Sequence, residues 1–280
     1  MSEKKLRMIT YLSPGLPVQL FEVLMQYLEE ITGMETYLIY ESRWTGPPRE
    51  RTDPFTADEV DIGFMSSETF LPLQQKKNSY VELCGAAPLH VHAKSQANPV
   101  YFSDLIINTA DIGEYKEVHD LRGHSFAYVD EASLSGCLVV LQELKKMGFN
   151  SSFFGNVLRS GSHLKSIQMV LNKTALSASV DSTILHNYLQ QNPQHKENLT
   201  VLKSFGPLPI YPVVFNSRLP DDLKGKITQA LFDISSKKEW LEKLESFGVT
   251  GFKPVDMSTF LKEKELLEAV KKLSITAAYY

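Results

Sequence analysis

Ser125-Phe126-Ala127-Tyr128-Val129-Asp130-Glu131-Ala132-Ser133-Leu134-Ser135-Gly136 is the stretch that decides the fold. Its first five residues have the apolar character of a strand, and a polar Ser-x-Ser-Gly turn then leads into the apolar helical segment Cys137–Met147. This segment ends in two lysines followed by Gly148, which is typical of a helix C-terminus. The stretch therefore predicts a strand, a polar turn and a helix in direct succession.

The Ser-x-Ser-Gly turn is compatible with two roles. The first N–H groups of a helix have no partner within the helix and carry the positive end of its dipole, so they can bind phosphate, phosphonate or carboxylate. A serine at this place is equally well an ordinary helix cap. Taken alone, the turn favours the cap, and only its neighbours can favour a ligand site.

Two other predicted strands are followed by polar turns. Leu158–Leu164 leads from an apolar stretch into a helix, with Ser162 near the N-cap and His163 in the first turn. The strand pattern Val60–Met65 is followed by Ser66-Ser67-Glu68-Thr69, which we expect to open a helix by a hydroxyl cap. Because ligands of open α/β sheets lie outside the carboxyl ends of strands, the two helix starts at Ser133 and Ser162 together favour a ligand site, and the third turn at Ser66 indicates a shared design.

The composition is that of a soluble globular protein with room for two domains. The chain has 280 residues, of which 43% are hydrophobic and 22% charged. The net charge is −4, and no dense basic block is present, which argues against nucleic acid as a partner. A small anion would therefore have to be bound by local dipoles and hydroxyls.

The sequence offers no visible targeting or membrane segment. No signal peptide is evident at the amino terminus, and no apolar run reaches the ~18 residues of a membrane span. Cys84 and Cys137 make no disulfide framework and are expected to be buried free thiols. These features predict a cytoplasmic protein, or a periplasmic or extracellular one if the sequence is a mature form.

Strand and helix patterns alternate along the chain. The expected strands are Lys5–Leu12, Glu35–Tyr40, Val60–Met65, Val81–Pro88, Tyr101–Thr109, Ser125–Val129, Ala175–Val180 and Tyr211–Asn216. Besides the helix that opens at Ser66, the expected helices are Val18–Ile31, Cys137–Met147, Leu164–Asn172, Ser182–Leu189, Gly225–Ser235, Lys237–Phe247 and Phe260–Leu273. We expect a discontinuous lobe of residues 1–108 and 207–280, with a second lobe of residues 109–206 inserted through two hinge segments.

With these elements in place, the chain resembles the type II periplasmic binding proteins of the phosphonate/phosphite-binding family, the solute receptors of ABC importers. The segments that carry the resemblance, over nearly the whole chain, are Leu6–Leu12 with the Phe21-Glu22 helix, Val60–Gly63, Tyr101–Ile107, Asp120–Ala127, Ser133–Gly136, Gly161–His163, Val180–Ser182, Leu219–Lys224 and Gly248–Phe252. The resemblance implies an α/β fold of two lobes. Each lobe would be a mixed sheet flanked by helices, with the ligand cleft between the lobes.

The resemblance also implies which residues bind the ligand. Hydroxyls and amides at the Ser-x-Ser-Gly helix start would hold the anion, and aromatic residues of the other lobe would close over it. Asp181 matches a carboxylate position that can meet the ammonium group of an amine-bearing phosphonate, and Ser66 and Ser67 would supply donors from the opposite wall. The residues expected to bind ligand are Ser133, Leu134, Ser135, Gly136, Ser162, His163, Tyr101, Trp44, Ser66, Ser67 and Asp181.

Purely structural roles remain open for several of these residues. Tyr101 could be a strand aromatic that packs against a helix, and Asp181 could cap the following helix. Trp44 could shield the hinge without touching a ligand. The pair His90 and His92 lies in an expected polar loop, where we predict that both are exposed and bind no metal.

The function that the sequence favours is non-catalytic binding of a small phosphonate- or phosphate-type anion, with hinge closure and without a cofactor or metal. A transporter or a signalling protein is left open as a further partner. The alternative is a cytosolic enzyme on the same fold, similar to the menaquinone-pathway dehydratases, with His163 or Asp181 as a general base. A third possibility is a domain that has lost its ligand and serves as an interaction partner. No nucleophile elbow or phosphate-binding loop of an NTPase is present to support catalysis.

Overall fold

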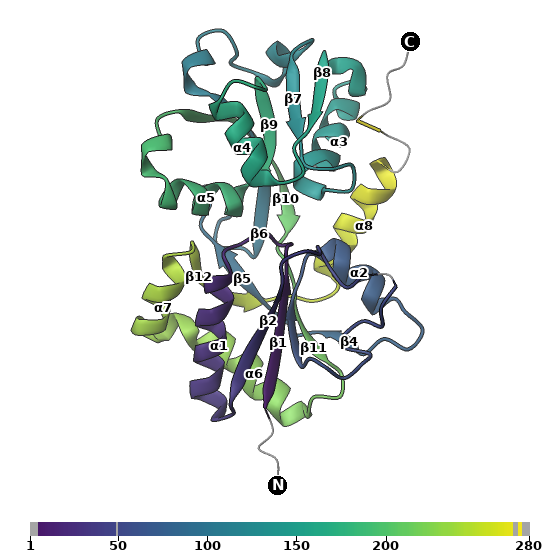
Figure 1. The fold of residues 1–280 in the computed structure, drawn as a ribbon, viewed down its shortest axis with the longest axis vertical. Helices are drawn as coiled ribbons and strands as arrows, with labels where there is room; N and C mark the ends of the chain where they lie inside the picture. Colours follow the sequence, from purple (N-terminus) through teal and green to yellow (C-terminus); the bar gives the residue numbers. More distant parts are fainter. Residues whose placement is uncertain (1–4, 49, 271–273, 276–280) are drawn as a thin grey trace. The chain divides into compact units, whose positions relative to one another are not determined.

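The computed structural model describes residues 5–48, 50–270 and 274–275. They fold as two compact α/β units, which confirms the expected fold class (Figure 1). Unit 1 comprises the residues up to Val100 together with Pro209–Phe260, and unit 2 comprises Tyr101–Leu208 together with the segment that begins at Leu261. The division expected from the sequence placed residues 207–280 in the discontinuous lobe and residues 109–206 in the other, whereas here the first boundary follows Val100 and the segment from Leu261 belongs to unit 2.

Unit 1 is built on a five-stranded mixed sheet in the order β2-β1-β3-β11-β4, beside a two-stranded ladder of β5 and β12. Strand β1 runs parallel to β2 and β3, whereas β11 runs antiparallel to β3 and β4. Its strands are β1 (Leu6–Tyr11), β2 (Thr36–Glu41), β3 (Ile62–Phe64), β4 (Val81–Leu83), β5 (Ala86–His90), β11 (Val213–Asn216) and β12 (Val249–Pro254).

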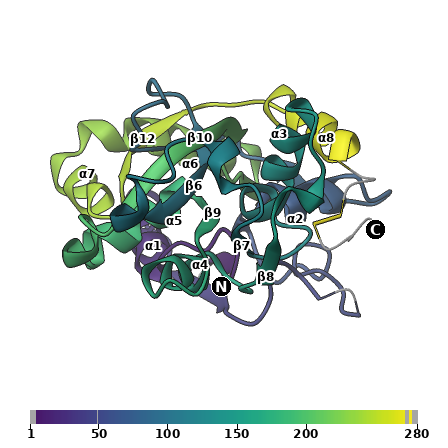
Figure 2. The ribbon, with the colours of Figure 1, turned by 90° about the horizontal axis from the view of Figure 1, so that it is seen from above.

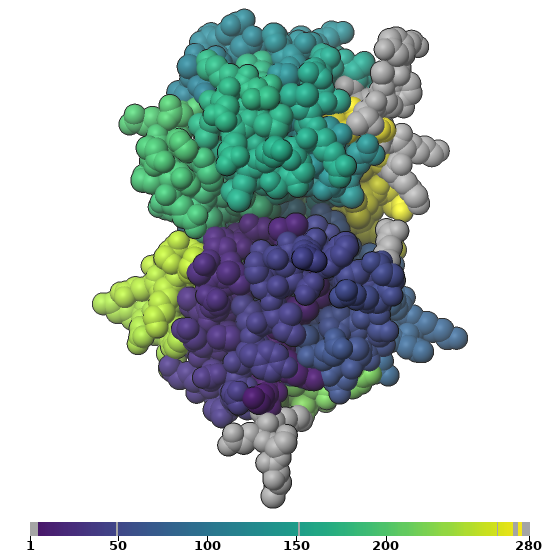
Figure 3. Space-filling view, viewed as in Figure 1, coloured from purple at the N-terminus to yellow at the C-terminus, as the bar shows by residue number. Residues whose placement is uncertain are grey.

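Helices of unit 1 cover this sheet on the outside. In the space-filling view, α1 and β2 form part of the purple and blue surface of unit 1, and α7 lies beside α1 (Figure 3). The helices are α1 (Val18–Thr32), α2 (Ser67–Gln74), α6 (Asp221–Asp233) and α7 (Lys238–Glu245), and α8 (Ser258–Val270) begins in this unit. Helix α1 buries Leu20, Phe21, Leu24 and Tyr27, which recur at helical spacing.

Unit 2 is built on a second five-stranded sheet in the order β10-β6-β9-β7-β8. Strand β7 is parallel to β8 and β9, and β6 is antiparallel to β9. Helix α3 lies on one face of this sheet and helices α4 and α5 on the other (Figures 1 and 2). The elements are β6 (Val100–Asn108), β7 (Ser125–Tyr128), β8 (Asn156–Arg159), β9 (Ser177–Asp181), β10 (Leu199–Pro209), α3 (Val139–Lys146), α4 (His163–Leu171) and α5 (Ser182–Gln191).

Most predicted elements are present with bounds shifted by a few residues, and the exceptions have local causes. The predicted strand Val81–Pro88 is two strands in different sheets, because Gly85 adopts a φ of 82° that turns the chain between them. Strands β10 and β12 were not predicted. The predicted helix Phe260–Leu273 corresponds to α8, and its residues 271–273 lie outside the described residues.

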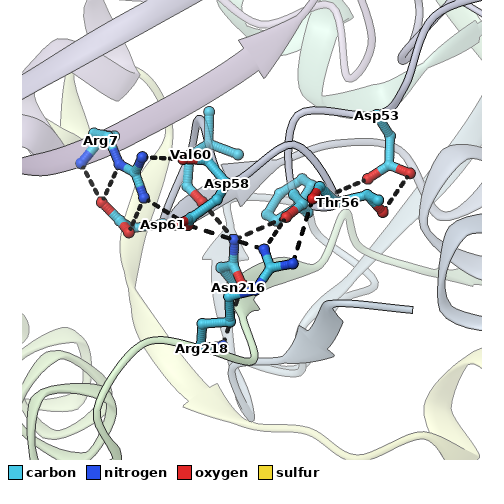
Figure 4. Close-up of polar contacts among 9 residues, drawn as sticks. Arg7, Asp53, Thr56, Asp58, Val60, Asp61, Asn216 and Arg218 are labelled. Carbon is cyan, nitrogen blue, oxygen red and sulfur yellow. Dashed lines mark hydrogen bonds and ion pairs between the residues drawn. The ribbon is translucent and has the colours of Figure 1, made fainter. Parts of the chain in front are cut away.

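A polar cluster fastens the loop that leads into β3 (Figure 4). The Arg7 guanidinium binds both carboxylate oxygens of Asp61, at 2.9 and 2.8 Å, and also contacts Asp58. From β11, the Asn216 amide donates to the Val60 carbonyl at 2.9 Å, and Arg218 donates to the Phe55 carbonyl at 2.8 Å. Because the loop is tied to β1 and to β11, the position of β3 and of the turn that follows it is fixed.

Candidate functional site

Three polar turns of unit 2 follow the three parallel strands β7, β8 and β9. Parallel strands bring their carboxyl ends to one edge of a sheet, so the turns lie at the same edge. Hydrogen bonds join them: the Gly161 N–H donates to the Val129 carbonyl at 3.0 Å, and the Asp181 N–H donates to His163 Nδ1 at 3.2 Å. The predicted residues of this lobe are thus on one connected set of turns.

The Ser-x-Ser-Gly turn combines a cap with unusual helical geometry. Ser133 Oγ accepts a hydrogen bond from the Gly136 N–H at 3.2 Å, so Ser133 is a helix cap, the role that the turn alone favoured. The following residues Leu134–Leu138 form a π-helical turn that continues into α3. Ser135 is 3% exposed, and its hydroxyl has no hydrogen-bond partner among the residues that the structure describes.

Gly136 is required by close packing. A Cβ atom at this position would lie 2.5 Å from Val129 Cγ2 and 2.8 Å from Ser133 Oγ. Neither contact is compatible with a side chain unless the turn or the end of β7 moves. The glycine therefore lets the helix start approach the strand that precedes it.

His163 begins helix α4, which Ser162 caps by accepting the Lys165 N–H at 3.2 Å. Burial lowers the pKa of His163 to about 4, so its ring is neutral near neutral pH. Its Nδ1 accepts the Asp181 N–H, and a neutral imidazole that accepts at Nδ1 carries its hydrogen on Nε2. His163 is therefore a neutral hydrogen-bond donor through Nε2.

Asp181 caps helix α5, as the structural alternative for this residue predicted. Its Oδ1 accepts from the Thr183 N–H at 2.7 Å, the Thr183 hydroxyl at 2.6 Å and the Ile184 N–H at 3.4 Å. Burial raises its pKa to about 7, with the nearby Asp104 contributing in the same direction and the cap hydrogen bonds opposing the shift. The carboxyl group is thus protonated at higher pH than an ordinary aspartate.

Tyr101 lies in β6 and is 8% exposed, and it is the first residue of unit 2. The resemblance had suggested that it belongs to the other lobe. The next residue is held by α5, because the Phe102 N–H donates to Ser182 Oγ at 3.0 Å. Tyr101 is therefore attached to the same unit as the Ser133 and His163 turns.

The predicted residues of unit 1 lie on two linked segments. Trp44 is 40% exposed, and its carbonyl accepts the Leu12 N–H at 2.9 Å, which places its loop beside the carboxyl end of β1. Ser66 and Ser67, both buried, follow β3. Thr69 joins the two segments, because its hydroxyl contacts Ser66 Oγ at 3.1 Å and donates to the Thr45 carbonyl at 3.0 Å.

Two predictions about side chains need correction. Ser66 occupies the N-cap position of α2, but its hydroxyl makes no hydrogen bond to a helix N–H, because it is engaged with Thr69. His90 is not in an exposed loop: it belongs to β5, is 4% exposed, and its Nε2 lies 3.2 Å from Tyr211 Oη. Among the described residues, no group of three or more His, Cys, Asp or Glu side chains is placed to hold a metal ion.

Three hydroxyl residues near these edges were missed by sequence reasoning. Ser103 in β6 and Ser179 in β9 are fully buried and both contact the carbonyl of Ser135. Thr10 near the end of β1 is fully buried, and its hydroxyl has no partner within the described residues. Serine and threonine at inward-facing strand positions are the only sequence signal, and this signal does not reveal which group they contact.

Of the comparisons with known proteins, the family model shows the family. A family model described as "ABC transporter, phosphonate, periplasmic substrate-binding protein" matches residues 6–260. Among curated proteins, no sequence matches.

Solved structures of low sequence identity share the fold. A binding protein component of an ABC phosphonate transporter from Pseudomonas aeruginosa is 18% identical, with a TM-score of 0.70 over 94% of this chain and 86% of that one. PhnD1 from Prochlorococcus marinus, in complex with methylphosphonate, is 14% identical, with a TM-score of 0.70 over 97% of this chain and 100% of PhnD1. XAC2383 from Xanthomonas citri, bound to ATP, is 14% identical, with a TM-score of 0.64 over 96% of this chain and 98% of XAC2383.

These findings decide two alternatives left by the sequence. The expected cytoplasmic location is wrong, because the matching family consists of periplasmic substrate-binding proteins. The same family supports non-catalytic binding and lends no support to the dehydratase-like enzyme. Within the described residues, no helix combines the length and the apolar character needed to cross a bilayer. The chain belongs to the family of phosphonate periplasmic substrate-binding proteins of ABC transporters.

Proposed function

We propose that this chain binds a small phosphonate- or phosphate-type anion at the polar edge of unit 2, with Ser133, Leu134, Ser135 and Gly136 forming the start of the site. The observation that carries the proposal is that three parallel strands of one sheet each end in a polar turn at the same edge. The helical segment from Leu134 to Lys146 directs its N-terminal amides to this edge. An anion there meets amides, hydroxyls and a helix dipole.

His163 supplies a donor that does not depend on protonation. With Nδ1 accepting the Asp181 N–H, its Nε2–H can donate to an anion oxygen while the ring stays neutral. A neutral ring is a weak competitor for the proton of a phosphonate monoanion, and it is also a poor general base. His163 and Ser162 are therefore proposed as binding residues.

Asp181 sets a preference among the possible ligands. A carboxyl group with a pKa near 7 gains little from a simple dianion, but it ionises readily beside an ammonium group. We accordingly expect an aminoalkylphosphonate to bind more tightly than methylphosphonate. Tyr101 of unit 2 and the unit 1 residues Trp44, Ser66 and Ser67 are proposed as additional contacts, and the closure of the lobes on a ligand stays a prediction.

Calorimetric titration tests the proposal with four probes: methylphosphonate, an aminoalkylphosphonate, inorganic phosphate and ATP. ATP is included because the related XAC2383 from Xanthomonas citri was solved with it. We expect the phosphonates to bind and the Ser133→Ala/Ser135→Ala variant to bind at least about tenfold more weakly. A Ser152→Ala variant, which changes an exposed serine of the same unit, is the matched control. Binding that is equal in wild type and in the double variant would overturn the assignment of the site.

A further inference from the structure

Two fully buried serines lie beneath the Ser133–Gly136 turn. Ser103 in β6 and Ser179 in β9 are on neighbouring strands, and both have 0% exposed surface. Ser103 Oγ lies 2.6 Å from the Ser135 carbonyl oxygen, and Ser179 Oγ lies 2.9 Å from the same oxygen. The two hydroxyl oxygens are 2.5 Å apart. Two strand side chains thus converge on one carbonyl of the turn.

The number of hydroxyl protons determines how this cluster is bonded. Each serine hydroxyl has one proton, so two protons serve three close oxygen contacts. The 2.5 Å separation of the two hydroxyls requires a proton between them, which leaves one for the carbonyl. The shorter contact favours Ser103 as the donor to Ser135, with Ser179 donating to Ser103. Such a chain strengthens the final hydrogen bond by polarisation.

The cluster fixes one peptide plane of the turn from both sides. The carbonyl of Ser135 accepts from Ser103, whose hydroxyl is in turn bonded by Ser179, and the N–H of Gly136, in the same planar peptide, donates to Ser133 Oγ at 3.2 Å. A peptide held at its oxygen and at its nitrogen cannot rotate. The Ser135–Gly136 peptide, at the start of the proposed anion site, therefore has a fixed direction before any ligand arrives, and it restricts the backbone of Ser135.

We infer that Ser103 and Ser179 are positioning residues of this anion site, which they preorganise through the Ser135–Gly136 peptide; the inference rests on the proposed function of that turn. Neither side chain touches the ligand. Their contribution to affinity is the ordering of the turn, a cost that binding would otherwise bear.

A double-mutant cycle on methylphosphonate affinity tests this inference. In the Ser103→Ala variant, Ser179 can still donate to the carbonyl, and in the Ser179→Ala variant Ser103 can do so. We expect each single variant to bind about two- to threefold more weakly, and the Ser103→Ala/Ser179→Ala variant about tenfold or more. The loss in the double variant should therefore exceed the product of the single losses.

Ser177→Ala is the matched control. Ser177 is also fully buried, lies on the same face of β9, and contacts the Ser125 carbonyl at 3.4 Å instead of the turn. We expect Ser177→Ala to lower the unfolding midpoint in denaturant without a change in affinity. A double variant that loses stability but keeps wild-type affinity would overturn the positioning role. If the double variant does not fold, the two single variants are compared with Ser177→Ala in the same way.

Hydrogen exchange separates failure of this inference from failure of the proposed function. In the ligand-free protein, the amides of 134–138 should exchange at least about fivefold faster in the double variant than in Ser177→Ala. Faster exchange in a protein whose wild type binds no anion would refute the proposed function and leave the ordering of the turn intact. Unchanged exchange at 134–138 would overturn the inference even if the wild type binds methylphosphonate.

Discussion

The turn at Ser133–Gly136 in unit 2 and the turn at Ser66–Thr69 in unit 1 have the same local pattern, a polar pair of serines between a strand and a helix. They differ in how their hydroxyls are used. Ser133 accepts an N–H of its own helix, and the peptide after Ser135 is held from beneath by two strand serines. Ser66 contacts the side chain of Thr69, which in turn holds the carbonyl of Thr45.

The serine hydroxyls that follow a strand therefore have different roles in the two turns. In unit 2 the surrounding groups hold the turn, and the Ser135 hydroxyl has no partner among the described residues. In unit 1 the hydroxyls of Ser66 and Thr69 fasten a loop, so the same sequence pattern serves the placement of Trp44. The shared pattern identifies both edges, but only the neighbours of each turn determine its role.

The largest expected effect follows from a pair of glycines, one at each turn. A Cβ at Gly136 would lie 2.5 Å from Val129 Cγ2, in unit 2, whereas a Cβ at Gly46 would lie 2.5 Å from Thr69 Cγ2, in unit 1. We expect Gly136→Ala to lower the free energy of unfolding by about 1–3 kcal/mol and to abolish measurable methylphosphonate binding. Gly46→Ala should weaken binding by less than about threefold, because its clash with Thr69 is confined to unit 1 and the proposed anion site begins in unit 2.

Calorimetric titration and urea denaturation measure both variants side by side. The comparison between the turns fails if Gly46→Ala reduces affinity as strongly as Gly136→Ala does. It also fails if Gly136→Ala folds and binds like the wild type, since the close approach of the turn to β7 would then be dispensable.

The second prediction concerns pH and involves only the unit 2 edge. The folded pKa of His163, about 4, is below its ordinary 6.5, so between these values the unfolded chain binds a proton that the folded chain does not. Stability from this group falls as the pH drops through that window. The folded pKa of Asp181, about 7, is above its ordinary 3.8, so its contribution falls as the pH rises from 3.8 to 7.

The two contributions oppose each other in the wild type and separate in variants. Relative to wild type, Asp181→Asn should gain stability as the pH rises from 4 to 7, and His163→Gln should gain stability as the pH falls from 6.5 to 4. Each slope is at most about 1.4 kcal/mol per pH unit. Urea denaturation across this range, in phosphate-free buffer, measures them. Curves parallel to the wild-type curve would refute the two shifts.

The smallest expected effect belongs to the unit 1 turn. Thr69→Val removes the hydroxyl that links Ser66 to Thr45 and should cost about 0.5–1.5 kcal/mol of stability. We expect faster hydrogen exchange in the loop 42–46 and a change of less than about threefold in anion affinity. A loss of affinity as large as that of Ser133→Ala/Ser135→Ala would mean that the unit 1 turn contributes as much to anion affinity as the unit 2 turn.

The sequence predicted the turns better than it predicted their surroundings. Ser133, Ser162 and Ser66 follow apolar strands, and this local signal located all three helix starts correctly. Ser103 and Ser179 could not be found in this way, because an inward serine of a strand shows its role only when the group opposite it is known. That group, the Ser135 carbonyl, is about 30 residues away from Ser103 and more from Ser179.

Two strand errors have the same kind of cause. Gly206-Pro207 is normally a sign that a strand has ended, yet β10 runs through it, because β10 is the edge strand of its sheet and needs no partner on its free side. Conversely, Val81–Pro88 reads as one apolar strand, and only the left-handed conformation of Gly85 divides it. The position of a strand within its sheet and the sign of a residue's φ angle are both properties of the folded chain.

The unequal exposure of the two tryptophans gives this protein two optical signals. Trp240 is buried in unit 1, with its ring 5.4 Å from that of Tyr27 and the Lys243 ammonium 4.1 Å from its centre. Trp44 is 40% exposed on a loop anchored at Leu12. The emission spectrum is therefore the sum of a short-wavelength component and a water-relaxed component. If a ligand covers Trp44, as proposed, only the second component shifts, and binding is then visible in the emission without an added dye.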